Sequence, residues 1–314
     1  MRVITSGAAY IDIDAYACIV AYAELLRIQG VEAVALTTAP LNESISKTVR
    51  SWHVSLETKY TPSLSDTFTL IDVSDPGHFD KVVDLTRVDE VIDHHPGFES
   101  YWQEHIGDDA HIEFIGAACT LVYEQWKAAG LLEKMSVTSA RLLVCGILDN
   151  TLNFGASVTT QRDIDAYDAL LAQADLPDNW TAHYFTECQE VILSDPVTAI
   201  RNDTKVLMFK SFDKPVCIGQ LVVWDGDQVI AQHEKALRES LVQTRSEWLI
   251  NLISVGDRKS YFVTDNPHIQ KWLSKLLDIQ FNNVSAVATR PWLRKEIIQE
   301  DISYAALDNY EREE

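Results

Sequence analysis

Apolar and polar positions in the first half of the chain alternate between strand-like and helix-like stretches. Short apolar runs at residues 2–5, 31–37, 67–73 and 88–92 predict buried strands. Longer stretches with helical spacing separate or follow them, at about residues 15–29, 115–132, 137–148 and 160–176. The first of these ends near Gly30, the residue type that most often stops a helix. This alternation predicts an α/β fold with a parallel sheet and helices on both of its faces.

The second half of the chain has a different order of elements. Helical sequence continues over residues 180–192 and breaks at Ser194-Asp195-Pro196, so we expect a first domain of residues 1–192 and a second of residues 193–314. Strands are expected at 205–209, 216–224, 248–254, 260–264 and from about Val284. An amphipathic helix over about 232–243 and another after Pro267 complete a smaller, mixed α/β domain.

Composition narrows the class of protein. The 314 residues are 46% apolar, enough for two cores, and no apolar run approaches the roughly 18 residues that span a bilayer. The N-terminus opens as a strand and lacks the apolar core of a signal peptide, so we expect a cytoplasmic protein without a membrane partner. A net charge of -21 disfavours a protein that grips long nucleic acid. Five widely spaced cysteines indicate buried free thiols and no disulfide framework.

The candidate chemistry begins at Asp93-His94-His95, directly after the strand predicted at 88–92. Ligands of open α/β sheets bind at the carboxyl ends of the strands, and a metal ion would be the most economical partner for three such groups. Three further acidic segments lie at strand or helix ends, at residues 11–14, 70–75 and 146–151. Each alone is more often a helix cap or a solvated turn, but four in order favour a site.

Carboxylates with imidazole suit manganese, magnesium, cobalt or zinc. No cysteine accompanies the set in the sequence, which we take to exclude thiolate-selecting metals. A pair of divalent ions can activate water and bind phosphoryl oxygens, so phosphoryl hydrolysis is the predicted reaction class.

These motifs carry a resemblance to a known family. Besides Asp93-His94-His95, they are residues 115–124, 146–154 and 159–163, and in the second half Asp203-Thr204-Lys205, Ile218-Gly219-Gln220 and residues 293–296. The chain resembles the DHH phosphoesterase superfamily, in particular its branch of family II inorganic pyrophosphatases and exopolyphosphatases. The glycine-rich, histidine-containing motif of the oligonucleotide-cleaving branch is absent from the sequence. The resemblance therefore implies a small phosphorylated substrate with a phosphoanhydride bond.

The resemblance also implies roles for individual residues. One or two ions, of manganese or alternatively of magnesium or cobalt, would be bound by Asp12, Asp14, Asp72 and His94. Asn150 stands at a further ligand position, with Asp149 directly before it. His95, with Asp93, would be catalytic, either behind the metal ligands or as a proton donor near the leaving group. The second domain would clamp the substrate's phosphates through Lys205, Lys295 and Arg294, with Arg290 competing for the role of Arg294. The active site would then lie in the cleft between the two domains.

Two positions depart from the family's pattern. Ala8 stands where the family has a histidine, and Asn150 where it has a bridging aspartate. A methyl group cannot bind a metal and a neutral amide bridges poorly, so we expect a weakened first metal site. Asp149, His78 or Asp75 could supply a replacement ligand.

Three hypotheses follow for the function. The first is a metal-dependent phosphohydrolase, the second a degenerate relative that binds a phosphorylated ligand without turnover, and the third a phosphodiesterase for short oligonucleotides or cyclic dinucleotides. The strand expected at residues 31–37 could pair two subunits in a homodimer.

Overall fold

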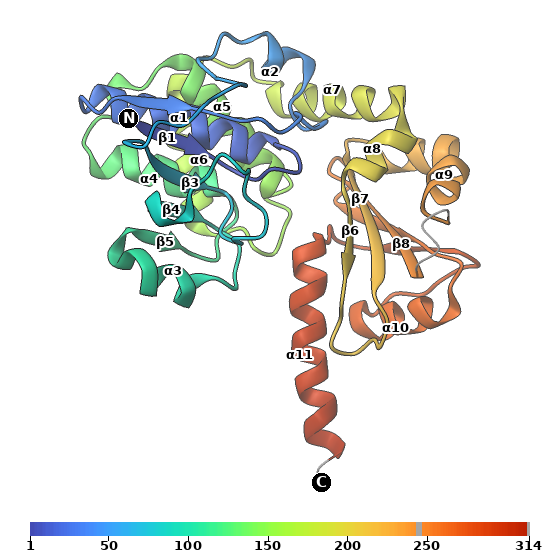
Figure 1. The fold of residues 1–314 in the computed structure, drawn as a ribbon. Helices are drawn as coiled ribbons and strands as arrows, with labels where there is room; N and C mark the ends of the chain where they lie inside the picture. The colour runs from blue at the N-terminus through green and yellow to red at the C-terminus, as the bar shows by residue number, and fades with distance from the viewer. Residues whose placement is uncertain (243–246, 313–314) are drawn as a thin grey trace. The chain divides into compact units, whose positions relative to one another are not determined.

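The structure, a computed structural model, describes residues 1–242 and 247–312 and contains two compact units (Figure 1). The first unit comprises Met1–Phe154 and Val158–Tyr184, and the second comprises Gly155–Ser157 and Phe185–Glu314. The boundary expected between residues 192 and 193 and the observed division after Tyr184 both fall within one helix, α7 (Trp180–Ser194).

The first unit contains one sheet of five parallel strands. They are β1 (Arg2–Thr5), β2 (Ala33–Ala35), β3 (Thr67–Ile71), β4 (Val88–Asp93) and β5 (Ala110–Ile112), in the spatial order β2-β1-β3-β4-β5. The parallel sheet predicted from the sequence is confirmed. The chain leaves β1 toward β2 on one side and continues through β3, β4 and β5 on the other. The topological switch point therefore lies between β1 and β3, where sheets of this kind bind ligands.

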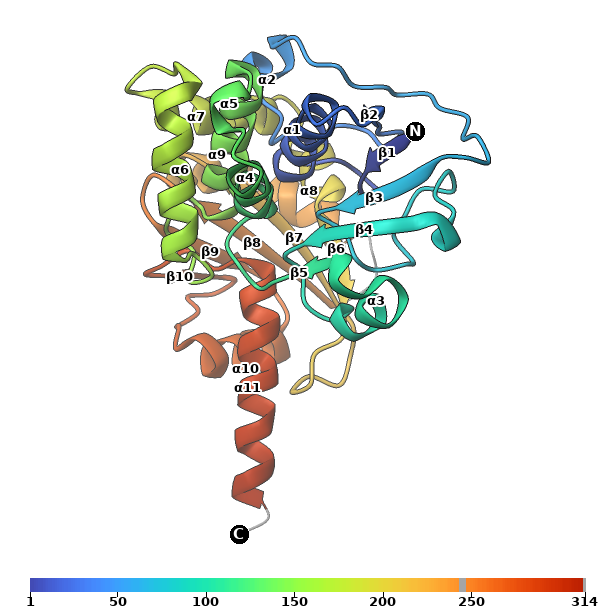
Figure 2. The ribbon, with the colours of Figure 1, turned by 90° about the vertical axis from the view of Figure 1, so that its left-hand side faces the viewer.

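Helices cover both faces of this sheet (Figure 2). The helices of this unit are α1 (Ile13–Ile28), α2 (Lys47–Ser51), α3 (Glu99–Ile106), α4 (Ala118–Ala128), α5 (Val137–Asn150), α6 (Gln161–Ala174) and the start of α7, with 3-10 turns at Leu85–Arg87, Gly107–Asp109 and Leu132–Lys134. In Figure 2, α1, α4 and α5 lie on one side and α3 lies on the other. Trp102 of α3 packs there with Val3, Phe68 and Val91 of the sheet. On the opposite side, α1 is buried almost all round because it lies against the sheet, α4 and α5.

One expected helix start is wrong and one strand was missed, each for an identifiable reason. The helix expected over residues 115–132 begins only at Ala118, because Ala117 is extended and the backbone N–H groups of Gly116 and Ala117 bind the Asp163 carboxylate. The short strand β5 was not expected. Its three residues are all only half-buried, so it carries no apolar signal.

The second unit is built on a mixed sheet, as expected. Its strands are β6 (Thr204–Leu207), β7 (Val216–Val223), β8 (Glu247–Ser254), β9 (Lys259–Val263) and β10 (Ser285–Ala288), in the order β10-β9-β8-β7-β6. Only β7 and β8 pair in parallel among these strands. The helices are α8 (Pro196–Asn202), α9 (Gly226–Val242), α10 (Pro267–Leu277) and α11 (Arg294–Arg312). One apolar cluster centres on Phe262 and Trp272, and a second on Leu221 and Ile250.

Two further observations concern surfaces. Across the described ranges, no helix combines the length and the apolar character that crossing a bilayer requires. The outer edge of β2 is already partly paired, because Thr37 donates to the Glu57 carbonyl and Glu57 donates to the Ala35 carbonyl. A homodimer formed through this edge stays a prediction, and it would have to use the part of the edge beyond these bonds.

Candidate metal centre

The carboxyl ends of three neighbouring strands bring the sequence-predicted acids and histidines together. Asp14 lies in the first turn of α1 after β1, Asp72 directly follows β3, and His94 directly follows β4. The side chains of Asp72, His94 and His95 offer ligand atoms that all lie within 4.8 Å of one another. This group lies at the carboxyl ends of β3 and β4, beside the switch point between β1 and β3.

His94 is held in one orientation. Its Nδ1 lies 3.0 Å from the carbonyl oxygen of Ile115, and its ring is buried. Because a carbonyl can only accept, Nδ1 carries the proton of this hydrogen bond. Nε2 faces two carboxylates, 3.3 Å from Asp72 Oδ1 and 3.8 Å from Asp14 Oδ2. A bare Nε2 lone pair would be repelled there, so this nitrogen needs either a proton or a cation.

These distances fit a shared divalent ion. Two donors bonded at about 2.1 Å lie about 3.0–3.4 Å apart when they subtend 90–109° at the ion. The distance between His94 Nε2 and Asp72 Oδ1 is within this range, and that to Asp14 Oδ2 exceeds it by a few tenths of an ångström. The hydrogen bond from Nδ1 to a backbone carbonyl is the usual support of a metal-binding imidazole. Asp72 and His94 therefore fit a metal site, with Asp14 as the further carboxylate that faces His94 Nε2.

Asp72 has a strained backbone. Its φ is 61°, in the left-handed region that non-glycine residues rarely adopt, and its N–H donates to the Ile92 carbonyl at 2.9 Å. Such strain costs on the order of 1–3 kcal/mol and concentrates at functional sites. The bond to the neighbouring strand fixes the residue where its carboxylate meets His94.

Asp93 organises the histidine pair and is itself fully buried. Its Oδ1 accepts hydrogen bonds from the backbone N–H groups of His94 at 2.7 Å and His95 at 3.2 Å, and lies 2.9 Å from His95 Nδ1. The other oxygen, Oδ2, accepts no hydrogen bond from any residue that the structure describes. The His95 side chain is 48% exposed. Asp93 thus fixes the ring of a solvent-accessible histidine, in line with the pairing of these two residues expected from the family.

Asp14 serves the helix behind it as well as the site. Its Oδ2 accepts from the N–H of Ala118 and its Oδ1 from the N–H of Cys119, both at 2.9 Å. The methyl side chain of Ala117 cannot cap α4, so Asp14 caps this helix from α1. Burial, and secondly the charge of Asp12, raise the pKa of Asp14 to about 6. An ionised Asp14 is therefore costly in the metal-free fold, and a neighbouring cation would offset that cost.

The remaining expected ligands are placed less directly. Asp12 caps α1 by accepting from the N–H of Ala15 at 3.0 Å, and it is close enough to influence the pKa of Asp14. Asp149 accepts a hydrogen bond from the Tyr184 hydroxyl at 3.0 Å, and Asn150 is the last residue of α5. Direct ligation by Asp12, Asp149 and Asn150 stays a prediction.

His78 lies beside Ala8, the position at which the resemblance leads us to expect a histidine. The N–H of Ala8 donates to the carbonyl of His78 at 2.9 Å, so the segment that carries His78 and Asp75 does run beside it. The His78 side chain is 71% exposed and lies 3.6 Å from Asp75 Oδ2. The position of His78 beside Ala8 agrees with the expectation that His78 replaces the missing histidine ligand. The exposure of the His78 ring to solvent disagrees with that expectation.

The backbone is also strained in the turn shortly after Asn150. Leu152, Asn153 and Phe154 have φ values of 52°, 52° and 59°, three successive residues in the left-handed region. Non-glycine residues usually adopt this conformation singly. Thr151 supports the turn, because its hydroxyl accepts from the N–H of Phe154 at 3.1 Å and donates to the Ile147 carbonyl.

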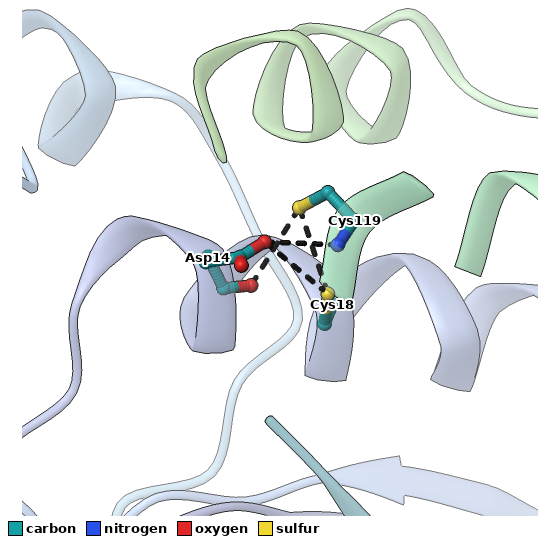
Figure 3. Close-up of side chains that lie close together, drawn as sticks. All are labelled: Asp14, Cys18 and Cys119. Atoms are coloured by element: carbon teal, nitrogen blue, oxygen red, sulfur yellow. Dashed lines mark hydrogen bonds between the residues drawn. The ribbon is translucent and has the colours of Figure 1, made fainter. Parts of the chain in front are cut away.

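Sequence reasoning missed two cysteines. All five cysteines are buried free thiols, as expected. The expectation that none accompanies the acidic set is wrong, because Cys18 Sγ lies 3.9 Å from Asp14 Oδ1 and 3.5 Å from Cys119 Sγ (Figure 3). Burial raises the pKa of both thiols. The spacing of Asp14 and Cys18, four residues apart on one helix, was a signal for the first contact.

In the second unit, the two arginines expected to bind phosphate are both engaged. Arg294 is buried, and its guanidinium donates to Asp203 Oδ1 at 2.6 Å, to the Asp203 carbonyl at 2.9 Å and to the Ile218 carbonyl at 3.3 Å. Arg290 donates to Glu296 Oε1 at 2.9 Å. The Arg290 side chain is 38% exposed against 9% for Arg294, so Arg290 is the more accessible of the two.

The two lysines of this set lie on different elements. Lys205 is an exposed residue of β6, and Lys295 is a half-buried residue in the first turn of α11. Contact of Lys205, Arg290, Arg294 and Lys295 with a substrate stays a prediction.

Comparison with known proteins gives the same fold. No protein-family model matches the chain, and no curated protein matches its sequence significantly. A solved structure from Methanococcus jannaschii, provisionally assigned as a family II inorganic pyrophosphatase, is similar with a TM-score of 0.69 and 18% identity, over 97% of this chain and 99% of that one. An exopolyphosphatase-related protein from Bacteroides fragilis is similar with a TM-score of 0.51 and 13% identity, over 98% and 93%. The chain therefore has the two-domain α/β fold seen in family II pyrophosphatases.

Proposed function

We propose that the protein is a divalent-metal-dependent phosphohydrolase that acts on phosphoanhydrides: pyrophosphate, short polyphosphate or a small phosphorylated metabolite. The observation that carries the proposal is His94, whose Nδ1 is fixed on the Ile115 carbonyl while Nε2 faces Asp72 and Asp14. The fold, shared with structures described as a pyrophosphatase and as an exopolyphosphatase-related protein, supports the same reaction class.

Each residue has a distinct role in this proposal. Asp14, Asp72 and His94 would hold the ion, manganese or alternatively magnesium or cobalt. When bound, a divalent ion supplies Lewis acidity to phosphoryl oxygens and activates water for attack. In its doubly protonated form, His95 would hold one proton on Nδ1 against Asp93 and give the proton on Nε2 of this half-exposed ring to a leaving oxygen, which returns the ring to its neutral form.

Substrate binding has to overcome the charge of the protein. A polyanion is repelled by a chain of net charge -21 unless local cations face it. Lys205, Lys295 and Arg290 are our candidates for those cations. Arg294 would first have to exchange the Asp203 carboxylate, which it binds at 2.6 Å, for a phosphate.

The test is phosphate release from pyrophosphate and tripolyphosphate with added manganese, magnesium or cobalt. We expect release that depends on the ion, stops on chelation and is lost in His94→Ala. A matched control is His105→Ala, an exposed histidine of α3 that stacks on Tyr101, which should keep its rate. No release by the folded wild-type protein with any of the three ions would overturn the proposal.

A second candidate is a phosphate-binding protein without turnover. Ala8 favours it, because its methyl group cannot ligate a metal and the neighbouring His78 ring is largely exposed. This candidate predicts calorimetric binding of pyrophosphate that survives chelation, together with no phosphate release. Ion-dependent release would exclude it.

A further inference from the structure

The contact between Asp14 and two thiols forms a second cluster of metal-binding side chains. Asp14 and Cys18 lie one turn apart on the same face of α1, and Cys119 lies in the first turn of α4 (Figure 3). All three side chains are fully buried. We propose that Asp14, Cys18 and Cys119 form a site for a thiol-preferring d10 cation, of which zinc is the test case, and that this ion competes for Asp14 with the proposed hydrolytic ion.

The spacing of the donors supports a cation. Zinc binds thiolate at about 2.3 Å and carboxylate at about 2.0–2.2 Å, so tetrahedral neighbours lie about 3.8 Å apart for two sulfurs and about 3.5 Å apart for sulfur and oxygen. The observed separations are 3.5 Å between the two Sγ atoms and 3.9 Å between Cys18 Sγ and Asp14 Oδ1.

The size of the whole triangle leads to the same conclusion. The three ligand atoms all lie within 4.8 Å of one another. If the third distance, between Cys119 Sγ and the Asp14 oxygen, had this upper value of 4.8 Å, an ion equidistant from the three ligand atoms would lie about 2.4 Å from each. This distance is close to the length of a zinc–sulfur bond. A disulfide would instead require the sulfurs to approach to about 2.05 Å. The cluster is therefore nearer to the geometry of coordination than to that of oxidation.

The surroundings of the cluster suit this use. Gly146 of α5 packs directly on it, since a Cβ at this position would lie 2.3 Å from Cys119 Sγ and 3.1 Å from Asp14 Oδ1. The absence of a side chain there leaves room for the sulfur. The N-terminus of α4, which already donates to Asp14 through Ala118 and Cys119, would partly balance the negative charge of two thiolates and one carboxylate around a divalent ion. Each thiol that binds the ion releases its proton to solvent.

Competition follows from the position of Asp14. Its Oδ2 lies 3.8 Å from His94 Nε2, whereas its Oδ1 lies 3.9 Å from Cys18 Sγ. An ion on the thiol side would draw the carboxylate away from His94. This regulatory part rests on the proposed hydrolytic function, and the existence of the site does not.

The site is tested with Co²⁺ as a spectroscopic substitute for zinc, which has no absorption band of its own. The metal-free, reduced full-length protein is titrated with Co²⁺, and the near-ultraviolet band of cobalt–thiolate charge transfer is recorded. Cobalt bound only to carboxylates and imidazole lacks this intense band. We expect the band in wild-type protein and in His94→Ala, and its loss in Cys18→Ala and Cys119→Ala. The control is Cys217→Ala, which removes a buried thiol of the second unit and should keep the band.

A folded wild-type protein without the band would overturn the proposed site, as would a band that survives both cysteine substitutions. The cobalt–thiolate band can be recorded without turnover, so this test of the site remains valid even if the proposed hydrolase function is wrong. If phosphate release is observed, zinc should lower it in wild-type protein and lose that effect in Cys18→Ala. Equal inhibition of both proteins would overturn the competition.

Discussion

The cost of ionising Asp14 in the metal-free fold is a prediction with a defined magnitude. Burial and the neighbouring Asp12 raise its pKa from 3.8 to about 6. At about 1.4 kcal/mol per pH unit, this shift corresponds to roughly 3 kcal/mol. Because the folded state holds the proton more tightly than the unfolded chain, the contribution of Asp14 to stability is fully present below pH 3.8 and is lost as the pH rises through 6.

The perturbation is Asp14→Asn, which removes the ionisation and keeps the size of the side chain. Its NH2 group cannot accept one of the two hydrogen bonds that cap α4, and this loss is the same at every pH. We expect urea unfolding of the chelated wild-type protein to lose about 2.4 kcal/mol relative to Asp14→Asn between pH 4 and pH 7, because a small part of the contribution is already lost at pH 4. The difference between the two proteins isolates Asp14 from other groups with perturbed pKa values, such as Glu90.

A bound cation should change the stability of the two proteins differently. Added manganese at pH 7 should stabilise wild-type protein more than Asp14→Asn, because Asp72 and His94 remain in both proteins but only wild-type protein has the buried Asp14 charge that the cation offsets. If the difference in unfolding free energy between wild-type protein and Asp14→Asn stays constant from pH 4 to pH 7, the cost of ionisation does not belong to Asp14.

Further predictions concern the metal ligands and the packing behind them. Asp72→Asn should keep the fold, because Asn tolerates a φ of 61°, and should lose metal, whereas Asp72→Ala should cost about 1–2 kcal/mol more in urea unfolding. Ala8→His with Asn150→Asp should raise the metal content found by elemental analysis; unchanged content would mean that these positions are not the missing ligands. Gly146→Ala should destabilise by about 1–3 kcal/mol, since the new Cβ would meet Cys119 Sγ at 2.3 Å, and an unchanged unfolding midpoint would show that the sulfur can move aside.

The sequence was sufficient for the parallel sheet and for the expectation that Asp14, Asp72 and His94 lie at its carboxyl edge. Parallel strands that share a sheet place their carboxyl ends at one edge, so acids and histidines that follow strands were expected along it. That β3 and β4 are neighbours, which brings Asp72 beside His94, was not predicted from the sequence. The pattern of apolar and polar residues is enough to predict which residues follow a strand, because that prediction requires the positions of the strand ends and no knowledge of side-chain packing.

Contacts between helices far apart in the chain could not be predicted in this way. Cys18 and Cys119 meet across more than a hundred residues, since α4 packs on α1, and no periodicity encodes that pairing. The buried pairing of Arg294 with Asp203 depends likewise on how α11 begins beside β6 and β7. The late start of α4 required knowledge that Asp163 binds the backbone at Gly116.

The central claim is that His94, Asp72 and Asp14 hold a divalent ion, and crystals grown with manganese test it most directly. Anomalous scattering recorded at the manganese edge should show a peak about 2.1 Å from His94 Nε2, with Asp72 Oδ1 and Asp14 Oδ2 as neighbours. A well-ordered His94 with no anomalous peak in bonding range, at manganese concentrations that saturate any activity, would contradict the account.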